Sequence, residues 1–212
     1  MNVFFIRHGE SMGNRQGKIQ GWMDFELSEL GIKQAQLLAA YSENLALDYL
    51  YSSDLTRAYD TAKAIAARNH LDVRKWTKVR EVHLGPLQGL SRPDIYERFP
   101  ETKERSILTS GLDGTESVEQ LTKRCRFVVE QLLLAHQNDN IAIVSHGGFI
   151  SILLTYLLAG EQWPSLHRAF QIGNTSITHV EWTKEQKPVI HYTNQTIHLS
   201  SLLEPSNKIG LL

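Results

Sequence analysis

Two histidines in this chain each follow a run of apolar residues and precede a glycine. Val3-Phe4-Phe5-Ile6 leads into Arg7-His8-Gly9, and Ile141-Ala142-Ile143-Val144-Ser145 leads into His146-Gly147-Gly148. Short apolar runs predict buried strands, and residues at the carboxyl ends of strands face ligands in α/β proteins. The two runs therefore predict that both histidines lie at one edge of a single sheet.

The chemistry that this pair favours is phosphoryl transfer without a metal ion. A neutral imidazole can attack phosphorus and form a phosphohistidine, which divides one difficult displacement into two easier ones. We assign the nucleophile to His8, and we expect cationic neighbours to keep its imidazole unprotonated, because a nearby like charge disfavours the imidazolium. Arg7 and Arg57 carry forked, permanent cations that suit the three equatorial oxygens of a transferring phosphoryl group.

Three further residues complete a candidate phosphate pocket. His146 and Asn14 offer hydrogen-bond donors. Gly147 lies at the start of a predicted helix, where backbone N–H groups can bind an anion. Taken singly, Arg57 would be a surface arginine and His146 a core histidine. Asn14 and Gly147 would be turn formers. Their occurrence together with His8 is what favours a catalytic site.

Glu81 is the candidate general acid. A leaving alkoxide needs a proton, and in the second half-reaction the same carboxylate would activate water. The plainer interpretation of Glu81 is an exposed glutamate in a charged loop. His83 belongs to the same loop, and its role stays open. Since the nine histidines show no metal-ligand spacing, we predict no metal and no cofactor.

The residues around these candidates resemble a known family. Arg7-His8-Gly9-Glu10-Ser11 with Asn14 is similar to the signature of the histidine phosphatase superfamily, whose other large branch is the cofactor-dependent phosphoglycerate mutases. The match continues in order along nearly the whole chain, through Gly21-Trp22-x-Asp24, Leu27-Ser28-x-x-Gly31, Ser52-Ser53-Asp54-Leu55-x-Arg57-Ala58, Arg80-Glu81 with Gly85, Gly114-x-Glu116-Ser117, Ser145-His146-Gly147 and Asn174-Thr175-Ser176. Several motifs in the right order are far more specific than any one of them.

The resemblance implies an α/β fold, a three-layer α/β/α sandwich with a mostly parallel central sheet, as a single domain over residues 1–212. The segment 91–115, which has two prolines and many charges, is the expected small cap over the site. The resemblance also implies a substrate and phosphate pocket made of the residues that match the family's own: Arg7, Asn14, Gln20, Gly21, Arg57, His146 and Gly147.

Two branches of the family leave different signals here. Gly85-Pro86-Leu87-Gln88-Gly89-Leu90 resembles the mutases, and Arg92 falls where mutases bind the substrate carboxylate. The paired lid arginines of a mutase are missing, because only separated basic residues follow in the cap: Arg98, Lys103 and Arg105. We favour a phosphomonoester hydrolase that acts on a small phosphorylated metabolite. A mutase primed by 2,3-bisphosphoglycerate is the second hypothesis, and a phospholigand-binding module without turnover is the third.

Composition limits the partners and the compartment. The 212 residues are 42% hydrophobic and 21% charged, and 22 basic against 23 acidic residues leave a net charge of −1. No strong field therefore favours nucleic acid or an anionic membrane. The single Cys125 fits a reducing compartment, and no signal-peptide pattern precedes the first strand, so we expect a cytoplasmic protein. The oligomeric state is left open.

Hydrophobic periodicity places the remaining elements. Apolar positions at helical spacing predict helices that begin at Ser28, after the capping pair Ser53-Asp54, near Val118 and near Gly148. Cys125 lies on the apolar stripe of the third helix, which favours a core position. Strands are expected at about 2–6, 48–51, 141–145, 175–182 and 189–193.

Overall fold

A six-stranded sheet runs through the centre of the protein, in the order β3-β2-β4-β1-β5-β6. The computed structural model describes residues 1–104, 106–166 and 169–202. Neighbouring strands from β3 to β1 are parallel, whereas β5 is antiparallel to both β1 and β6. The strands are β1 (Asn2–Arg7), β2 (Tyr49–Ser52), β3 (Val73–Lys75), β4 (Asn140–Ser145), β5 (Ile177–Trp182) and β6 (Pro188–Gln195).

The central strands are apolar on both faces because helices cover both sides of the sheet. In β1, Val3 and Phe5 join one hydrophobic core, while the alternate residues Phe4 and Ile6 join the other. Residues of β4 divide between the two cores in the same way. This burial on both faces explains why the sequence shows continuous apolar runs rather than alternation.

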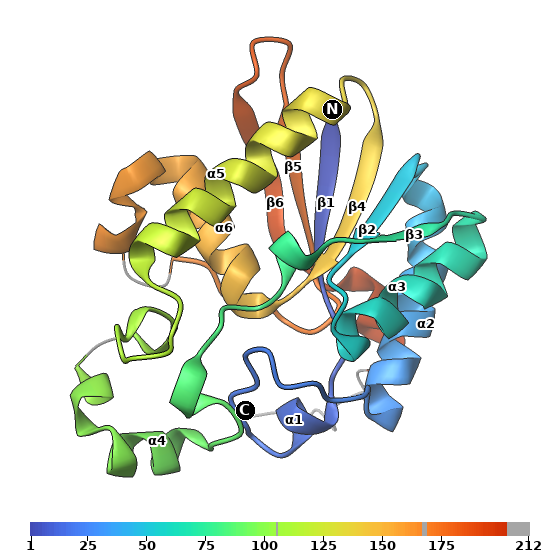
Figure 1. Ribbon diagram of the computed structural model, residues 1–212. Helices are drawn as coiled ribbons and strands as arrows, with labels where there is room; N and C mark the ends of the chain where they lie inside the picture. Colours follow the sequence, from blue (N-terminus) through green and yellow to red (C-terminus); the bar gives the residue numbers. More distant parts are fainter. Residues whose placement is uncertain (105, 167–168, 203–212) are drawn as a thin grey trace, which may run out of the picture.

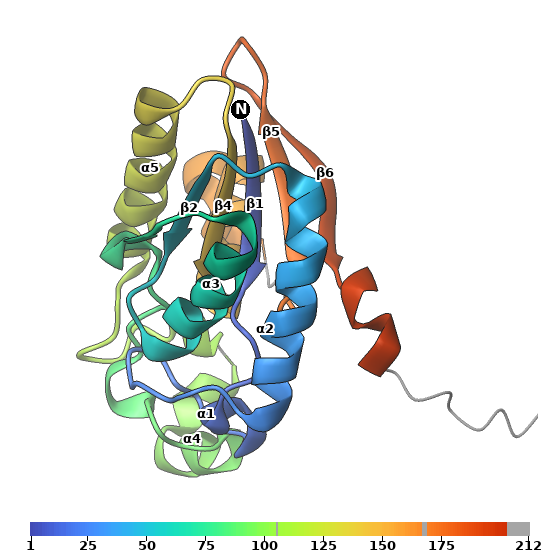
Figure 2. The same ribbon diagram turned by 90° about the vertical axis from the view of Figure 1, so that its right-hand side faces the viewer.

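Two helix layers enclose the sheet. The helices α5 (Val118–Ala135) and α6 (Gly147–Ala159) lie on one face, and α2 (Glu29–Ser42) and α3 (Thr56–Asn69) lie on the other. The edge-on view in Figure 2 shows the three layers directly. The mostly parallel α/β/α architecture that the sequence predicts is therefore confirmed.

No helix within the described ranges is long and apolar enough to cross a bilayer. Cys125 of α5 has no exposed surface, and burial raises the pKa of its thiol to about 12. The core assignment of Cys125 is confirmed.

The start of α3 differs from the prediction. Ser28 caps α2 as expected, since its Oγ accepts from the Gly31 N–H at 3.0 Å. The N-cap of α3, however, is Leu55, which has no side-chain cap. Asp24, from a distant loop, accepts from the Thr56 N–H at 2.8 Å and from its hydroxyl at 2.6 Å. A long-range carboxylate thus takes the capping role that the sequence assigned to Ser53-Asp54, which no local pattern reveals.

Short elements surround the end of the sheet where β1 and β4 finish. The loop after β1 contains the single-turn helix α1 (Met12–Arg15), and the three-residue strand β3 lies at the sheet edge; neither is predicted from the sequence. The cap segment holds α4 (Arg92–Arg98) and the 3-10 turns η4 (Pro100–Lys103) and η5 (Ile107–Thr109). Figure 1 shows α1 and α4 beneath the strand ends. Arg105 lies outside the described residues.

Candidate active site

His8 follows the last residue of β1 and lies beside the end of β4. The register pairs Arg7 with Ser145, and the His8 N–H donates to the Ser145 carbonyl at 3.0 Å. The side chain is 2% exposed, and its Nδ1 lies 2.7 Å from the Gly9 carbonyl oxygen. Since a carbonyl only accepts, Nδ1 must carry the proton. Nε2 therefore keeps the lone pair that a nucleophile needs.

The surroundings of His8 favour the neutral imidazole. Burial is the largest cause that lowers its pKa well below the usual value, followed by the charges of Arg57 and then Arg7. The sequence attributed this effect to the cations alone, so the ranking of the causes is corrected. Desolvation dominates because the imidazolium would lose its hydration without gaining an anionic partner.

His146 is placed beside His8 by the parallel neighbour strand. It is the N-cap of α6 and has no exposed surface, and its ring centroid lies 5.1 Å from that of His8. Its Nε2 lies 2.8 Å from the Ser53 Oγ, while its Nδ1 has no hydrogen-bond partner among the described residues. Burial, and then Arg57, lower its pKa well below the usual value. His146 can therefore orient one nitrogen on Ser53 and offer the other to a ligand.

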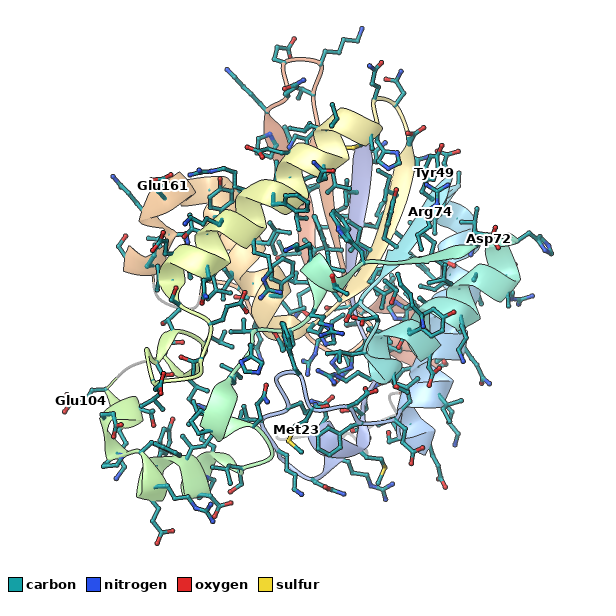
Figure 3. The ribbon with its side chains drawn as sticks, in the orientation of Figure 1. Met23, Tyr49, Asp72, Arg74, Glu104 and Glu161 are labelled. Atoms are coloured by element: carbon teal, nitrogen blue, oxygen red, sulfur yellow. The ribbon has the colours of Figure 1, made fainter. Side chains whose placement is uncertain are left out.

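Arg57 is buried against the loop that follows α1. Its side chain is 1% exposed, and its guanidinium donates to the Gly21 carbonyl at 2.8 Å and to the Met23 carbonyl at 2.9 Å. Met23, labelled in Figure 3, marks this loop. Burial lowers the pKa of Arg57 to about 10, so the side chain stays cationic at neutral pH. Gly21, a predicted substrate contact, thus contributes its carbonyl to holding Arg57.

Arg7 approaches the start of α6. Its Nη1 donates to the Ile172 carbonyl at 2.7 Å, and a Cβ placed on Gly147 would lie 3.3 Å from its Nε. The Gly147 N–H itself makes no hydrogen bond with the described residues. The cation and this helix-terminal donor therefore lie together, as a phosphate pocket requires.

Asn14 and Gln20 are locked through Ser11. The Asn14 Oδ1 accepts from the Ser11 N–H at 3.2 Å, in a capping box that begins α1. The Gln20 Oε1 accepts from the Ser11 hydroxyl at 2.7 Å. Both amide oxygens therefore take part in structural hydrogen bonds, while their N–H groups donate to no partner among the described residues.

Glu81 lies against the first turn of α6. It belongs to the loop between the 3-10 turns η2 (Thr77–Val79) and η3 (Gly85–Leu87). Its carboxylate accepts from the Gly148 N–H at 3.1 Å and from the Phe149 N–H at 2.8 Å. A Cβ on Gly148 would lie 2.6 Å from the Glu81 Oε1, so glycine is what permits this approach. The helix terminus thus brings the predicted acid next to the predicted pocket.

Two residues of the segment before β5 donate to the His8 carbonyl, and no role is predicted for them from the sequence. The Asn174 Nδ2 and the Thr175 N–H both donate to the His8 carbonyl, at 3.0 and 3.3 Å. Thr175 has a φ of 52°, which a β-branched residue rarely adopts. Both residues belong to a motif of the family resemblance, which was the only signal that could have found them.

His83 and Arg92 have other partners. The His83 Nδ1 lies 2.8 Å from the Gly114 carbonyl, and its ring packs edge-on against Trp22 at 4.8 Å between centroids. Arg92 is exposed at the start of α4 and donates to the Tyr96 hydroxyl at 3.1 Å. The structure therefore joins His8, His146, Arg7 and the buried Arg57, and leaves Arg92 on the surface of the cap.

A separate hollow of the surface lacks this chemistry. It has a volume of about 340 Å³ and lies between α2 and α3, and no histidine or arginine lines it. Across the described residues, no three His, Cys, Asp or Glu side chains are grouped so that they could hold a metal ion. The site is defined by a buried histidine pair, two arginines and a helix terminus.

The neighbouring parallel strands β1 and β4 are each followed by a buried histidine, at the same edge of a mostly parallel sheet covered by helices on both faces. The family model of the histidine phosphatase superfamily (branch 1) matches residues 3–196. The chain belongs to this superfamily.

Proteins similar to this chain include some named as phosphatases and some named as phosphoglycerate mutase-like. Phosphoserine phosphatase 1 of Hydrogenobacter thermophilus is 30% identical over 211 residues, covering 98% of this chain and 99% of the relative. Phosphoglycerate mutase-like protein 4 of Arabidopsis thaliana is 35% identical over 184 residues, covering 82% of this chain and 76% of the relative. A solved phosphoserine phosphatase of Entamoeba histolytica, in complex with 3-phosphoglyceric acid, has a TM-score of 0.79 at 31% identity and covers 93% of this chain and 98% of its own.

Proposed function

We propose that this protein is a phosphomonoester hydrolase that works through a phosphohistidine on His8. The observation that carries the proposal is the tautomer of His8. Its Nδ1 proton is held by the Gly9 carbonyl at 2.7 Å, and burial beside Arg57 keeps the ring neutral. The Nε2 lone pair is therefore available for attack without a separate general base.

The first half-reaction forms the Nε2–P bond and breaks the bond from phosphorus to the leaving oxygen. The arginines Arg7 and Arg57, with the N–H groups of Gly147 and Asn14, stabilise the charge on the equatorial oxygens. Protonated Glu81 gives its proton to the departing alkoxide. Its two oxygens each accept from the start of α6, which aims the carboxyl while leaving a lone pair for the proton.

The second half-reaction returns the enzyme to its starting state. The Glu81 carboxylate takes a proton from water, whose oxygen attacks phosphorus. The P–Nε2 bond breaks, its electron pair returns to His8, and inorganic phosphate leaves. The same residue thus acts as acid and then as base, as microscopic reversibility requires.

The positive charge for both steps comes from the protein, so the proposed mechanism includes no metal or cofactor. Support lies in Arg57, which remains cationic although it is buried. A chelator should leave the rate unchanged, and vanadate, which mimics five-coordinate phosphorus, should inhibit. Loss of activity in EDTA that magnesium or zinc restores would refute this part of the proposal.

A hydrolase is favoured over a mutase because the cap offers few cationic side chains that could bind the carboxylate of a hydroxy acid. A mutase must keep its phosphohistidine away from water, which demands a closing lid and cations for the substrate carboxylate. Arg92, the candidate cation, is exposed and bonded to Tyr96. Incubation with 3-phosphoglycerate and a 2,3-bisphosphoglycerate primer should release more phosphate than 2-phosphoglycerate. Faster isomerisation would favour the mutase.

The covalent intermediate is tested by a rapid quench with radiolabelled substrate. An acid-labile, alkali-stable label should appear on His8 and should be absent from the His8→Ala variant. Persistence of an unlabelled protein during turnover would contradict the mechanism. A screen of small phosphorylated metabolites, run on the same preparation, identifies the substrate within the proposed class.

A further inference from the structure

Arg124 of α5 reaches the loop that carries Glu81. Its side chain is 8% exposed, and its Nη1 donates to the Arg80 carbonyl at 2.7 Å. Its Nη2 donates to the Glu116 Oε2 at 2.8 Å, which makes an ion pair whose acidic side chain is 12% exposed. Neither residue belongs to the phosphate pocket, and the mechanism above uses neither. Their contacts instead converge on the neighbours of Glu81.

Glu116 holds the loop on the other side of Glu81. Its Oε2 accepts from the His83 N–H at 3.1 Å, and its own N–H donates to the His83 carbonyl at 2.8 Å. The residue before Glu81 is thus tied to Arg124, and the second residue after it is tied to Glu116. Because the two side chains are paired, the backbone on both sides of Glu81 is held by one unit.

Arg124 also contacts the helix that receives the Glu81 carboxylate. Its guanidinium carbon lies 4.3 Å from the centroid of the Phe149 ring, and the Phe149 N–H donates to the Glu81 Oε1 at 2.8 Å. A single buried cation therefore touches both the loop that bears Glu81 and the helix turn that aims it.

Burial of this pair is costly, which makes a purely stabilising role a poor explanation. Burial lowers the pKa of Arg124, and the charge of Glu116 only partly opposes this. Apolar residues often replace buried ion pairs without loss of stability, whereas a pair can enforce a unique geometry. The forked guanidinium suits this task because it can donate to a carbonyl and to a carboxylate at the same time.

We propose that Arg124 and Glu116 are positioning residues that hold Glu81 in the geometry of a general acid. The inference rests on the proposed function, since it takes Glu81 to be the acid. It assigns to α5 an effect on the leaving-group step that acts through Glu81, although α5 supplies no residue that touches the substrate.

The test compares two substrates that need the acid to different degrees. β-Glycerophosphate has an alkoxide leaving group that requires a proton, while the phenolate of p-nitrophenyl phosphate leaves unaided. The variants are Arg124→Met and the isosteric Glu116→Gln, with Arg126→Met as the matched control, because Arg126 is an exposed arginine of the same helix that pairs with Glu161. The ratio of kcat/KM for the two substrates, measured on one preparation, does not depend on the folded fraction.

If Glu81 is held less firmly, the ratio of kcat/KM on β-glycerophosphate to kcat/KM on p-nitrophenyl phosphate should fall. Since misplacement by about 1 Å can cost about 10²-fold, Arg124→Met should lose about that factor on β-glycerophosphate and much less on p-nitrophenyl phosphate. Glu116→Gln should lose less, because its amide oxygen can still accept from Arg124 and His83. Combining Arg124→Met with Glu81→Gln should add little to the ratio change of Glu81→Gln alone.

Each of the following results would overturn the inference. Equal losses on both substrates in Arg124→Met, which leave the ratio unchanged, would show that the pair only stabilises the fold. A ratio change as large in Arg126→Met would show that the effect is not specific. If Glu81→Gln itself slowed both substrates equally, the acid assignment would fail together with the inference. A selective Glu81→Gln beside a non-selective Arg124→Met would refute the inference alone.

Discussion

The two sides of the active site are built by different means. On the phosphate side, which consists of His8, His146, Arg7 and Arg57, the histidines directly follow paired strands and lie in the core with at most 2% exposure. On the acid side, Glu81 is half-buried on a loop between two 3-10 turns. Its carboxylate and its neighbours are held by contacts with α5, with α6 and with Glu116, which follows the cap.

This difference separates what is rigid from what can be adjusted. A parallel strand pair fixes the histidines through main-chain hydrogen bonds that no single side chain controls. The acid depends on a few side chains from distant segments, so one substitution can move it. We therefore expect variants of the phosphate side to lose activity on every substrate, and variants of the acid side to lose it according to the leaving group.

The largest effect is expected for His8→Ala on the phosphate side. Removal of the nucleophile should cost about 10⁴–10⁶-fold in kcat on alkyl and aryl phosphates alike. Steady-state kinetics on both substrates measures the loss, with exposed His70→Ala as the control. Substantial activity in His8→Ala would place the nucleophile elsewhere.

The acid side should respond selectively. Glu81→Gln should lose about 10²–10⁴-fold on alkyl phosphates, which is the usual contribution of general acid catalysis, and far less on p-nitrophenyl phosphate. A series of leaving groups of decreasing basicity should show the deficit shrinking steadily. A deficit that ignores leaving-group basicity would assign Glu81 to binding or folding.

Arg57→Lys tests the phosphate side without removing its charge. Lysine cannot donate to the Gly21 and Met23 carbonyls and to phosphate in the same fork, so kcat should fall about 10²–10³-fold, as for the loss of one oxyanion donor. The loss should be similar for both kinds of leaving group. The control is Arg68→Lys, at an exposed arginine of the same helix. A loss in Arg57→Lys that depends on the leaving group would contradict the proposed difference between the two sides.

The smallest effect is expected in the pH dependence of the protein's stability, through His198, which contacts Thr175 next to the phosphate side. His198 lies 3.2 Å from the Thr175 Oγ1, and burial lowers its pKa to about 4. In the unfolded chain the pKa of this histidine is about 6.5, so the unfolded state binds more protons than the folded state between about pH 6.5 and about pH 4. The contribution of neutral, buried His198 to the free energy of unfolding is therefore present above about pH 6.5 and is lost as the pH falls toward the folded pKa.

The melting temperature should therefore fall between about pH 7 and about pH 5, and less steeply in His198→Asn than in the parent protein. The exposed His70→Asn should keep the parent slope. A parent-like slope in His198→Asn would show that His198 does not contribute. His8 and His146, whose pKa values are also lowered by burial, act in the same direction in every variant.

The predictability of the site follows the same division. The apolar runs before His8 and His146 predict two buried strands, and the parallel pairing then places both residues at one edge without further information. The cap of α3 by Asp24 and the three-residue β3 were missed, because neither leaves a periodic or local signal. The sequence also overstated the cations at His8, since burial cannot be judged before the core is assembled.

The sequence by itself determined the family, the layered fold and the residue types of the site, because strand periodicity and the ordered motifs are properties of the chain read along its length. Only the tertiary structure decided how the site is held. The effect of Arg57 on His8, the burial of Arg57 beneath the loop of Gly21, and the contacts of Arg124 and Glu116 with the loop of Glu81 all join segments far apart in sequence. Such contacts depend on distance in space, which spacing along the chain does not encode.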